Sequence, residues 1–254
     1  RPTGTKSTLD YLFEFFDAYD FTSESTATVQ EQDKTIINAS VLGLIFEKIN
    51  GYKDGSFFTP GFITMYMCRE AIRKALVQKF NDYYKWDSKS FEELQDRIEY
   101  DKKEKRKEAN DIINSLKICD PAGGSGHFHV SALNEIITIK SELNILCYRD
   151  GSRIRSYRIS VENDELLVLD EEIDRLFEYV LNEHHKPTAE AQRLQEALFH
   201  EKQTIIENCL FGVDINPKSV MICRLRLWIE LLKHAYYTEQ SGYRHLETLP
   251  NIDI

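Results

Sequence analysis

The sequence predicts an α/β fold with a doubly wound sheet, preceded by a mostly helical N-terminal region. Two observations support this prediction. A short strand candidate, 115–119, runs into a glycine-rich loop and then into a helix. A second strand candidate, 209–213, ends at an acidic residue just before another long helix. Strands that alternate with helices in this way favour a parallel sheet covered by helices.

Composition limits the class of protein. The 254 residues suffice for one large domain, or one domain with a helical extension, and the 42% hydrophobic content argues against bulk disorder. The apolar runs are too short for a membrane span, and the N-terminus has no apolar segment of the secretory type. The five cysteines are odd in number and include no Cys-x-x-Cys, so we expect neither disulfides nor zinc, and a cytoplasmic location.

Residues 1–110 form the predicted helical region. Apolar residues at helical spacing predict helices over 7–19 and 35–49, and a loop over 51–55 ends the second. Pro60 suits the first turn of a helix that runs to about Phe80. A charged helix is predicted from Phe91 to Asn110.

Residues 111–254 form the predicted α/β region, which has an insertion at about 145–206. After the glycine loop, the pattern predicts a helix that begins after Gly126. The insertion is predicted to hold a β-hairpin over 145–161 around Asp150–Gly151, a strand at 166–169, and helices over 171–182 and 188–206. The second sheet strand and a helix over 217–237 complete the region.

The glycine loop, Asp120-Pro121-Ala122-Gly123-Gly124-Ser125-Gly126, is the first motif with chemical meaning. Glycines between a strand and a helix let a ligand approach the backbone, and the helix N-terminus presents free N–H groups. A nicotinamide site is disfavoured, because His129 stands where Gly-x-Gly-x-x-Gly requires its third glycine. Such a loop alone is weak support for ligand binding.

Asp214 strengthens the interpretation because it closes the second strand. In dinucleotide folds an acid at this place accepts hydrogen bonds from ribose hydroxyls. Its separation from the glycine loop is much longer than the usual roughly 20 residues, which is why an insertion over 145–206 is required.

Three motifs together resemble a known family, the amino-methylating DNA methyltransferases. The segment from Asp120 to Phe128 resembles their Asp-Pro-Ala-Cys-Gly-Ser-Gly-x-Phe motif, with Gly123 in place of the usual cysteine. The segment 211–217, followed by 224–228, resembles their second motif, and 55–60 resembles their upstream Thr-Pro motif. The resemblance covers roughly 37–254. It is closest to adenine-specific type IIG restriction-modification enzymes, and somewhat less close to type I modification subunits.

The resemblance implies a partial, Rossmann-like methyltransferase fold that binds S-adenosylmethionine. Phe58, Thr59 and Pro60 would line the methionine end of the cofactor, and Asp120 would face the methionine amino group. Asp214 would bind the ribose hydroxyls, and Ile215 would lie on the adenine ring. The glycine loop itself would be shaped by Pro121, Ala122, Gly123, Gly124 and Gly126, with Phe128 packed behind it.

Structural alternatives exist for these residues. Asp120 could cap a helix, and Asp214 could cap the helix that Pro217 opens. Phe58 and Phe128 could be ordinary core residues. His127 and His129 are two apart, so on a helix they point in different directions, and no metal site is predicted.

Parts of the family pattern are missing. No two of the six prolines are adjacent, so the Asn-Pro-Pro-Tyr-type motif that holds the target adenine is absent, and no catalytic residue is predicted. There is no Glu-x-Lys nuclease signature either. We therefore expect a cofactor-binding fragment that is inactive by itself, with double-stranded DNA as the partner of the full-length protein.

The net charge of −10 opposes a DNA-binding surface on this chain, since phosphate contacts need cations. The run 102–107 is a local basic candidate, although a solvated helix face is the simpler interpretation. Two alternatives stay open. One is a methyltransferase of the same fold that acts on RNA or protein, and the other is a non-catalytic interaction module.

Overall fold

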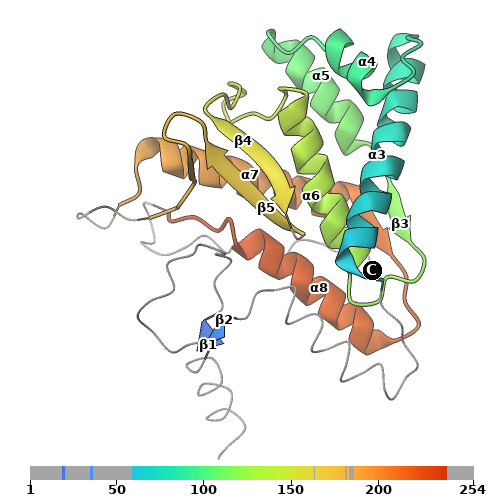
Figure 1. Ribbon diagram of the computed structural model, residues 1–254, viewed down its shortest axis with the longest axis vertical. Helices are drawn as coiled ribbons and strands as arrows, with labels where there is room; N and C mark the ends of the chain where they lie inside the picture. Colours follow the sequence, from blue (N-terminus) through green and yellow to red (C-terminus); the bar gives the residue numbers. More distant parts are fainter. Residues whose placement is uncertain are drawn as a thin grey trace, which may run out of the picture. The chain divides into compact units, whose positions relative to one another are not determined.

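A computed structural model of the chain describes residues 19–20, 35–36, 59–162, 164–180, 182 and 186–238 (Figure 1). Phe58, one of the predicted site residues, lies outside the described residues. The chain divides into two compact units, 1–57 and 58–254. Among the described helices, none is long and apolar enough to cross a bilayer.

The described part of the first unit is a pair of short parallel strands. Strand β1 (Tyr19–Asp20) pairs with β2 (Thr35–Ile36). The helices predicted over 7–19 and 35–49 are therefore wrong at Tyr19 and at Thr35–Ile36. The last two residues are β-branched, which favours a strand. The remainder of both predicted helices lies outside the described residues.

Three helices begin the second unit. Helix α3 (Gly61–Tyr84) confirms the predicted helix, although Pro60 is its N-cap and lies outside its first turn. The single helix predicted over 91–110 is wrong, since α4 (Phe91–Arg97) and α5 (Lys103–Asn114) are separate. The break between them is stabilised by the buried Arg106, whose Nη1 donates to the carbonyls of Tyr100 and Asp101 at 2.6 and 2.8 Å.

A parallel strand pair confirms the predicted alternation of strands and helices. Strand β3 (Ile118–Asp120) pairs with β7 (Leu210–Gly212), with Ile118 opposite Leu210 and Asp120 opposite Gly212. Helix α6 (His127–Glu142) follows β3 through the glycine loop. It is buried on nearly all sides, and Leu133, Ile136 and Ile137 are fully inaccessible at its centre. The helix also buries polar side chains, among them Ser131, Asn134 and Lys140, and these hydrogen-bond to neighbouring elements.

The inserted region contains a β-hairpin, but its register differs from the predicted one. Strand β4 (Tyr157–Glu162) pairs antiparallel with β5 (Glu165–Asp170), with Glu162 opposite Glu165, so the chain reverses between these two residues. The predicted reversal at Asp150–Gly151 is a tight turn that closes a single antiparallel bridge, Cys147 with Arg153. In Figure 1 the hairpin crosses beside α6, and β4 packs on that helix.

The helix predicted over 171–182 is wrong. Residues 171–174 form a turn, and β6 (Arg175–Leu176) pairs with β5. Two local features stop a helix here. Asp170 Oδ1 accepts the amide of Glu172 at 2.9 Å, and Asp174 adopts a left-handed φ of 51°.

Two long helices complete the unit. Helix α7 (Ala189–Cys209) confirms its prediction, with Thr188 as a side-chain cap that accepts from the Ala191 amide. Helix α8 (Pro217–Leu232) ends five residues earlier than the predicted 237. The amides of His234 and Ala235 return to carbonyls three residues back, which tightens the last turn and ends the helix.

Candidate functional site

The glycine loop and Asp214 lie together at the carboxyl edge of the β3–β7 pair. The Val213 amide donates to the Asp120 carbonyl, and the Gly123 amide donates to the Val213 carbonyl, both at 2.9 Å. These bonds continue the strand ladder past the ends of the strands. Ligands of open α/β sheets bind at this edge, so the topology predicts a ligand-binding site here.

Two glycines give the loop its conformation. Gly124 and Gly126 have φ values of 52° and 86°, which side chains rarely adopt. A Cβ at Gly126 would also lie 2.5 Å from Cys223 Sγ. Two constraints therefore require glycine at position 126: its left-handed backbone conformation and its close packing on α8.

Asp214 orders the loop through its carboxylate. Oδ2 accepts the Gly124 amide at 2.8 Å, and Oδ1 accepts the Asn216 amide at 2.7 Å. The cap of α8 is Asn216, whose side chain accepts from the Lys218 amide, so Asp214 does not have the predicted alternative role. Each carboxylate oxygen can accept more than one hydrogen bond, so Asp214 retains capacity for hydroxyl donors.

Asp120 has one satisfied oxygen and one unsatisfied oxygen. Oδ1 accepts the Ala122 amide at 3.0 Å, whereas Oδ2 is buried and has no partner among the described residues. Helix α6 is capped by Gly126, so Asp120 does not cap it. A buried acceptor without a donor is uncommon and calls for an explanation. A positively charged donor on a bound molecule would satisfy it.

His129 and Cys223 support the loop from behind. His129 Nε2 lies 3.0 Å from the Phe211 carbonyl, which can only accept, so Nε2 carries the proton. Nδ1 is then free to accept from the Cys223 thiol, 3.8 Å away. Burial lowers the pKa of His129 and raises the pKa of Cys223 to about 12, so both side chains are neutral.

Apolar surface accompanies these polar groups. The Ile215 side chain is 101% exposed, and Val213 is 59% exposed. Pro121 and Ala122 are also exposed on the loop, while Phe128 is half-buried and packs against the core. An isoleucine that is fully exposed beside an ordered carboxylate offers a flat apolar contact to a ligand.

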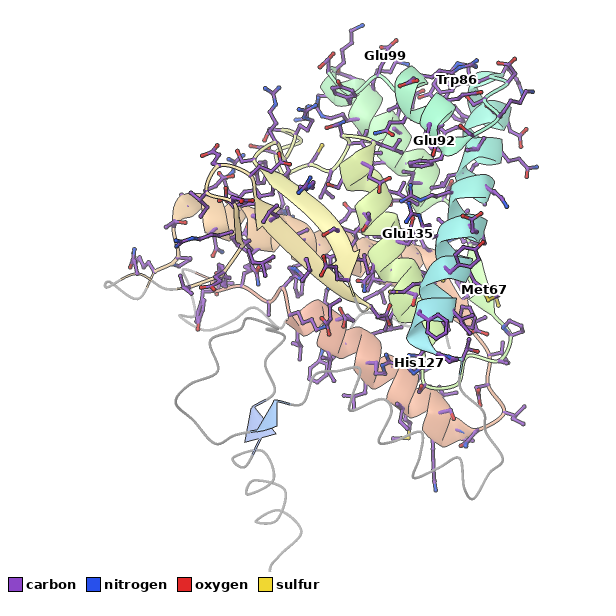
Figure 2. All side chains as sticks on the ribbon, viewed as in Figure 1. Met67, Trp86, Glu92, Glu99, His127 and Glu135 are labelled. Carbon is purple, nitrogen blue, oxygen red and sulfur yellow. The ribbon has the colours of Figure 1, made fainter. Side chains whose placement is uncertain are left out.

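The Thr59–Pro60 segment lies at the start of α3, which packs on α6. Thr64 Oγ1 contacts Ser131 Oγ at 2.8 Å, and the Cys68 thiol donates to the Phe128 carbonyl at 3.6 Å. Figure 2 labels Met67 on α3, and His127 and Glu135 on the neighbouring α6. The first turns of α3 are therefore beside the first turns of the helix that follows the glycine loop.

Several polar residues behind the loop were not predicted as site residues. Arg226 of α8 is buried and donates from Nη1 to the Ser125 carbonyl at 3.2 Å. Asp164, at the reversal of the β4–β5 hairpin, accepts from Ser131 Oγ at 2.8 Å. Their positions depend on tertiary packing, although Asn-Asp at 163–164 is itself a turn-forming pair in the sequence.

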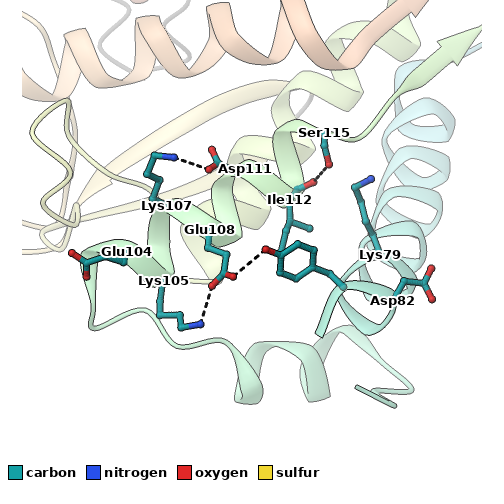
Figure 3. A pocket seen from close by; sticks show the side chains of 10 residues that line it. Lys79, Asp82, Glu104, Lys105, Lys107, Glu108, Asp111, Ile112 and Ser115 are labelled. Carbon is teal, nitrogen blue, oxygen red and sulfur yellow. Dashed lines mark hydrogen bonds and ion pairs between the residues drawn. The ribbon is translucent and has the colours of Figure 1, made fainter. Parts of the chain in front are cut away.

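A groove of about 860 Å³ lies elsewhere, between α3 and α5 (Figure 3). Its charges compensate one another: Lys105 lies 2.9 Å from Glu108, and Lys107 lies 2.8 Å from Asp111. The groove is lined by Lys79 and Tyr83, at the end of α3 opposite Pro60. It is therefore separate from the glycine-loop site. Within the described part of the chain, no three His, Cys, Asp or Glu side chains are grouped as metal ligands would be.

Comparison with known proteins gives one relative and one family match. The chain is 27% identical, over 257 aligned positions, to a protein of Methanocaldococcus jannaschii provisionally named a type II restriction enzyme and methyltransferase. The alignment covers 95% of this chain but 18% of the relative, so the chain spans less than a fifth of that protein's length. A domain family of unknown function (DUF7814) matches residues 1–37. No solved structure matches. This chain is thus similar in sequence to part of a protein that is named as both a restriction enzyme and a methyltransferase.

Proposed function

We propose that the chain is the S-adenosylmethionine-binding part of an adenine-specific DNA methyltransferase from a restriction-modification system. The proposal includes a Rossmann-like methyltransferase fold for 111–254 and a mostly helical region, 1–110, that carries the Phe-Thr-Pro motif. It also includes double-stranded DNA as the partner of the complete protein, and a cytoplasmic location. The relative's name supports the restriction-modification methyltransferase class, and the sequence motifs support the choice of adenine.

The unsatisfied Oδ2 of Asp120 is the observation that supports the cofactor most directly. The methionine ammonium of S-adenosylmethionine is a cationic donor, so it fits a buried carboxylate oxygen that lacks a partner. S-Adenosylmethionine, when bound, supplies the activated methyl group. The residues of this chain would hold and orient that cofactor.

We assign the remaining predicted residues to other parts of the same molecule. Asp214 can accept the ribose hydroxyls with the acceptor capacity that its two backbone bonds leave. Ile215 is exposed and can cover an adenine ring. The loop from Pro121 to Gly126 lets the cofactor approach the backbone, with Phe128 behind it, and Phe58, Thr59 and Pro60 would cover the methionine end.

The first test is a calorimetric titration of the chain with S-adenosylhomocysteine, which has the same amino-acid and nucleoside groups. Saturable binding with one site per chain is the expected result. An absence of binding would favour an interaction module that has the fold without its cofactor.

The location of the site is tested by Asp214→Ala. Loss of the ribose hydrogen bonds and of the Gly124 bond should weaken binding by about 1–3 kcal/mol. Asp170→Ala is the matched control, because Asp170 also accepts the amide two residues ahead of it but lies in β5, away from the glycine loop. Equal affinities for the two variants would show that Asp214 is not at the site.

A further inference from the structure

The reversal of the inserted hairpin carries a buried carboxylate. Asp164 follows β4 with a left-handed φ of 67°, and only 8% of the residue is exposed. An aspartate at a hairpin turn is ordinarily solvated, since turns lie at the surface. Here the turn is inserted between helices, which requires partners for every polar atom that it buries.

Those partners come from two helices. Ser131 Oγ of α6 donates to Asp164 Oδ1, and Asn134 Nδ2 donates to the Asp164 carbonyl, both at 2.8 Å. The Asp164 amide is directed at Met65 Sδ of α3, 3.1 Å away. One turn residue therefore contacts both α3 and α6.

The contact continues through Ser131 to the start of α3. Ser131 Oγ lies 2.8 Å from Thr64 Oγ1, and Thr64 is fully buried. Thr64 is four residues after Pro60, so the chain of contacts ends one helical turn from the Thr59–Pro60 segment. On the other side, α6 begins at the glycine loop, four residues before Ser131.

Titratable groups of the neighbouring elements act electrostatically on the same carboxylate. They are His127 of α6, Arg226 and Glu230 of α8, and Cys68 of α3, which also contributes the uncharged Met65. Burial raises the pKa of Asp164 to about 6, although the Ser131 hydroxyl and the charge of Arg226 oppose the rise. Arg226 also holds the Ser125 carbonyl of the glycine loop.

We propose that Asp164 is a positioning residue, which fixes the Thr59–Pro60 end of α3 against the glycine loop and thereby sets the affinity for the cofactor. This inference rests on the proposed function, because it assumes that both segments contact one ligand. The inserted hairpin then has a defined role: its turn joins the two sides of the site without touching the ligand.

The hydroxyls of Ser131 and Thr64 can each donate in either direction along this chain of contacts. A neutral side chain at position 164 that can itself donate should therefore hold α3 as Asp164 does. If Asp164 is ionised, Ser131 donates to it and Thr64 donates to Ser131. If Asp164 is protonated, each donor reverses, and Thr64 donates to the Gly61 carbonyl at 2.9 Å. Both directions keep the helices joined. An asparagine amide can donate to Ser131 in the second arrangement, whereas alanine removes the side-chain bond between position 164 and Ser131 in both.

The test compares Asp164→Ala, Asp164→Asn and a control, Glu162→Ala. Glu162 is an exposed acid in β4, two residues away, so the control removes the same charge from the same hairpin. Calorimetric titration with S-adenosylhomocysteine should show at least about tenfold weaker binding for Asp164→Ala. Asp164→Asn should remain within about threefold of the unaltered chain, and Glu162→Ala should match it.

Amide hydrogen exchange without ligand tests the positioning role directly. In Asp164→Ala, peptides over 61–68 should exchange faster, while peptides of α7 should be unchanged. Equal affinity and equal exchange in this variant would overturn the inference, as would faster exchange throughout the chain, which indicates a global loss of stability. If the unaltered chain binds no S-adenosylhomocysteine, the proposed function fails, but exchange confined to 61–68 would still support the role of Asp164 in holding α3.

Discussion

At the scale of single residues, the glycine loop depends on the side chains beneath it. Gly126 packs on Cys223, and the neighbouring His129 contacts both the thiol and the Phe211 carbonyl. Close packing of this kind leaves no room for an added methyl group. The two helices that meet under the loop, α6 and α8, are therefore held at a fixed separation.

Gly126→Ala should lower the free energy of unfolding by about 2–4 kcal/mol, through left-handed backbone strain and the clash with Cys223 Sγ. Urea unfolding measures this loss. Gly61→Ala is the matched control, because a Cβ there meets nothing within 4 Å. It begins α3, so alanine should leave stability unchanged or raise it by up to about 1 kcal/mol. Similar losses in both variants would contradict this account of Gly126.

The loop residues could be predicted from the sequence, because glycines and an acid at fixed places between a strand and a helix indicate a ligand-binding loop. The residues that pack beneath the loop could not be predicted in the same way. Cys223 and Arg226 are about 100 positions after the loop in the sequence. Arg226 lies in the segment 224–228 that resembles the second family motif, but the sequence does not indicate that it binds the Ser125 carbonyl. Burial of Asp164 depends on where the hairpin packs, which is a tertiary property.

At the scale of elements, α7 and α8 are joined by buried charges. Lys202 of α7 is inaccessible to solvent and donates to the Glu230 carboxylate of α8 at 3.1 Å. Lys233 donates to Glu230 at 2.6 Å and to Glu165 of β5 at 2.5 Å. Breaking such a pair is costly, because the remaining charge stays buried without compensation.

Glu230→Gln should destabilise the fold by about 3–5 kcal/mol near neutral pH, because the Lys202 charge would stay buried without the carboxylate that compensates it. Burial favours the neutral acid, but attraction to Lys202 and Lys233 outweighs it and lowers the pKa of Glu230 from 4.5 to about 2. The stabilisation is thus present above about pH 4.5 and is lost as the pH falls toward 2.

Urea unfolding of both proteins from pH 7 to pH 2 measures this dependence. The difference between them should be constant above about pH 4.5 and should shrink below it. A difference that is independent of pH over this range would show that the Glu230 charge does not contribute.

Elements with strong periodicity were predicted well, and those whose ends depend on tertiary contacts were not. Helices α3, α6 and α7 have long apolar patterns that a sequence reveals. The separation of α4 from α5 depends on Arg106 and the carbonyls that it binds, and the β4–β5 register depends on packing against α6. The Asp150–Gly151 turn was placed correctly, but the longer hairpin forms after it.

At the scale of the whole molecule, charge governs the interaction with nucleic acid. The net charge is −10, and two lysines of the basic run, Lys105 and Lys107, already pair with acids. Arg106 of the same run is buried and holds backbone carbonyls. Little of this run is therefore available for DNA phosphates.

We expect this chain to bind a labelled DNA duplex more weakly than about 100 µM in 150 mM salt, because non-specific binding is driven by cation–phosphate contacts. Fluorescence anisotropy measures the affinity, with an RNA duplex of the same length as the comparison. Tight binding that weakens steeply with salt would locate a basic surface on this chain and contradict the prediction.

The pairing of β3 with β7 also affects synthesis. Ile118 and Leu210 are partners across 92 positions of the chain. At about 5–20 residues per second, the ribosome adds the second strand roughly 5–20 s after the first. During that interval α6 and the hairpin can form from local contacts, whereas β3 still lacks β7, its partner within the described part of the chain. The nascent chain is then most prone to aggregation before Gly212 emerges, and chaperone binding should be concentrated in that interval.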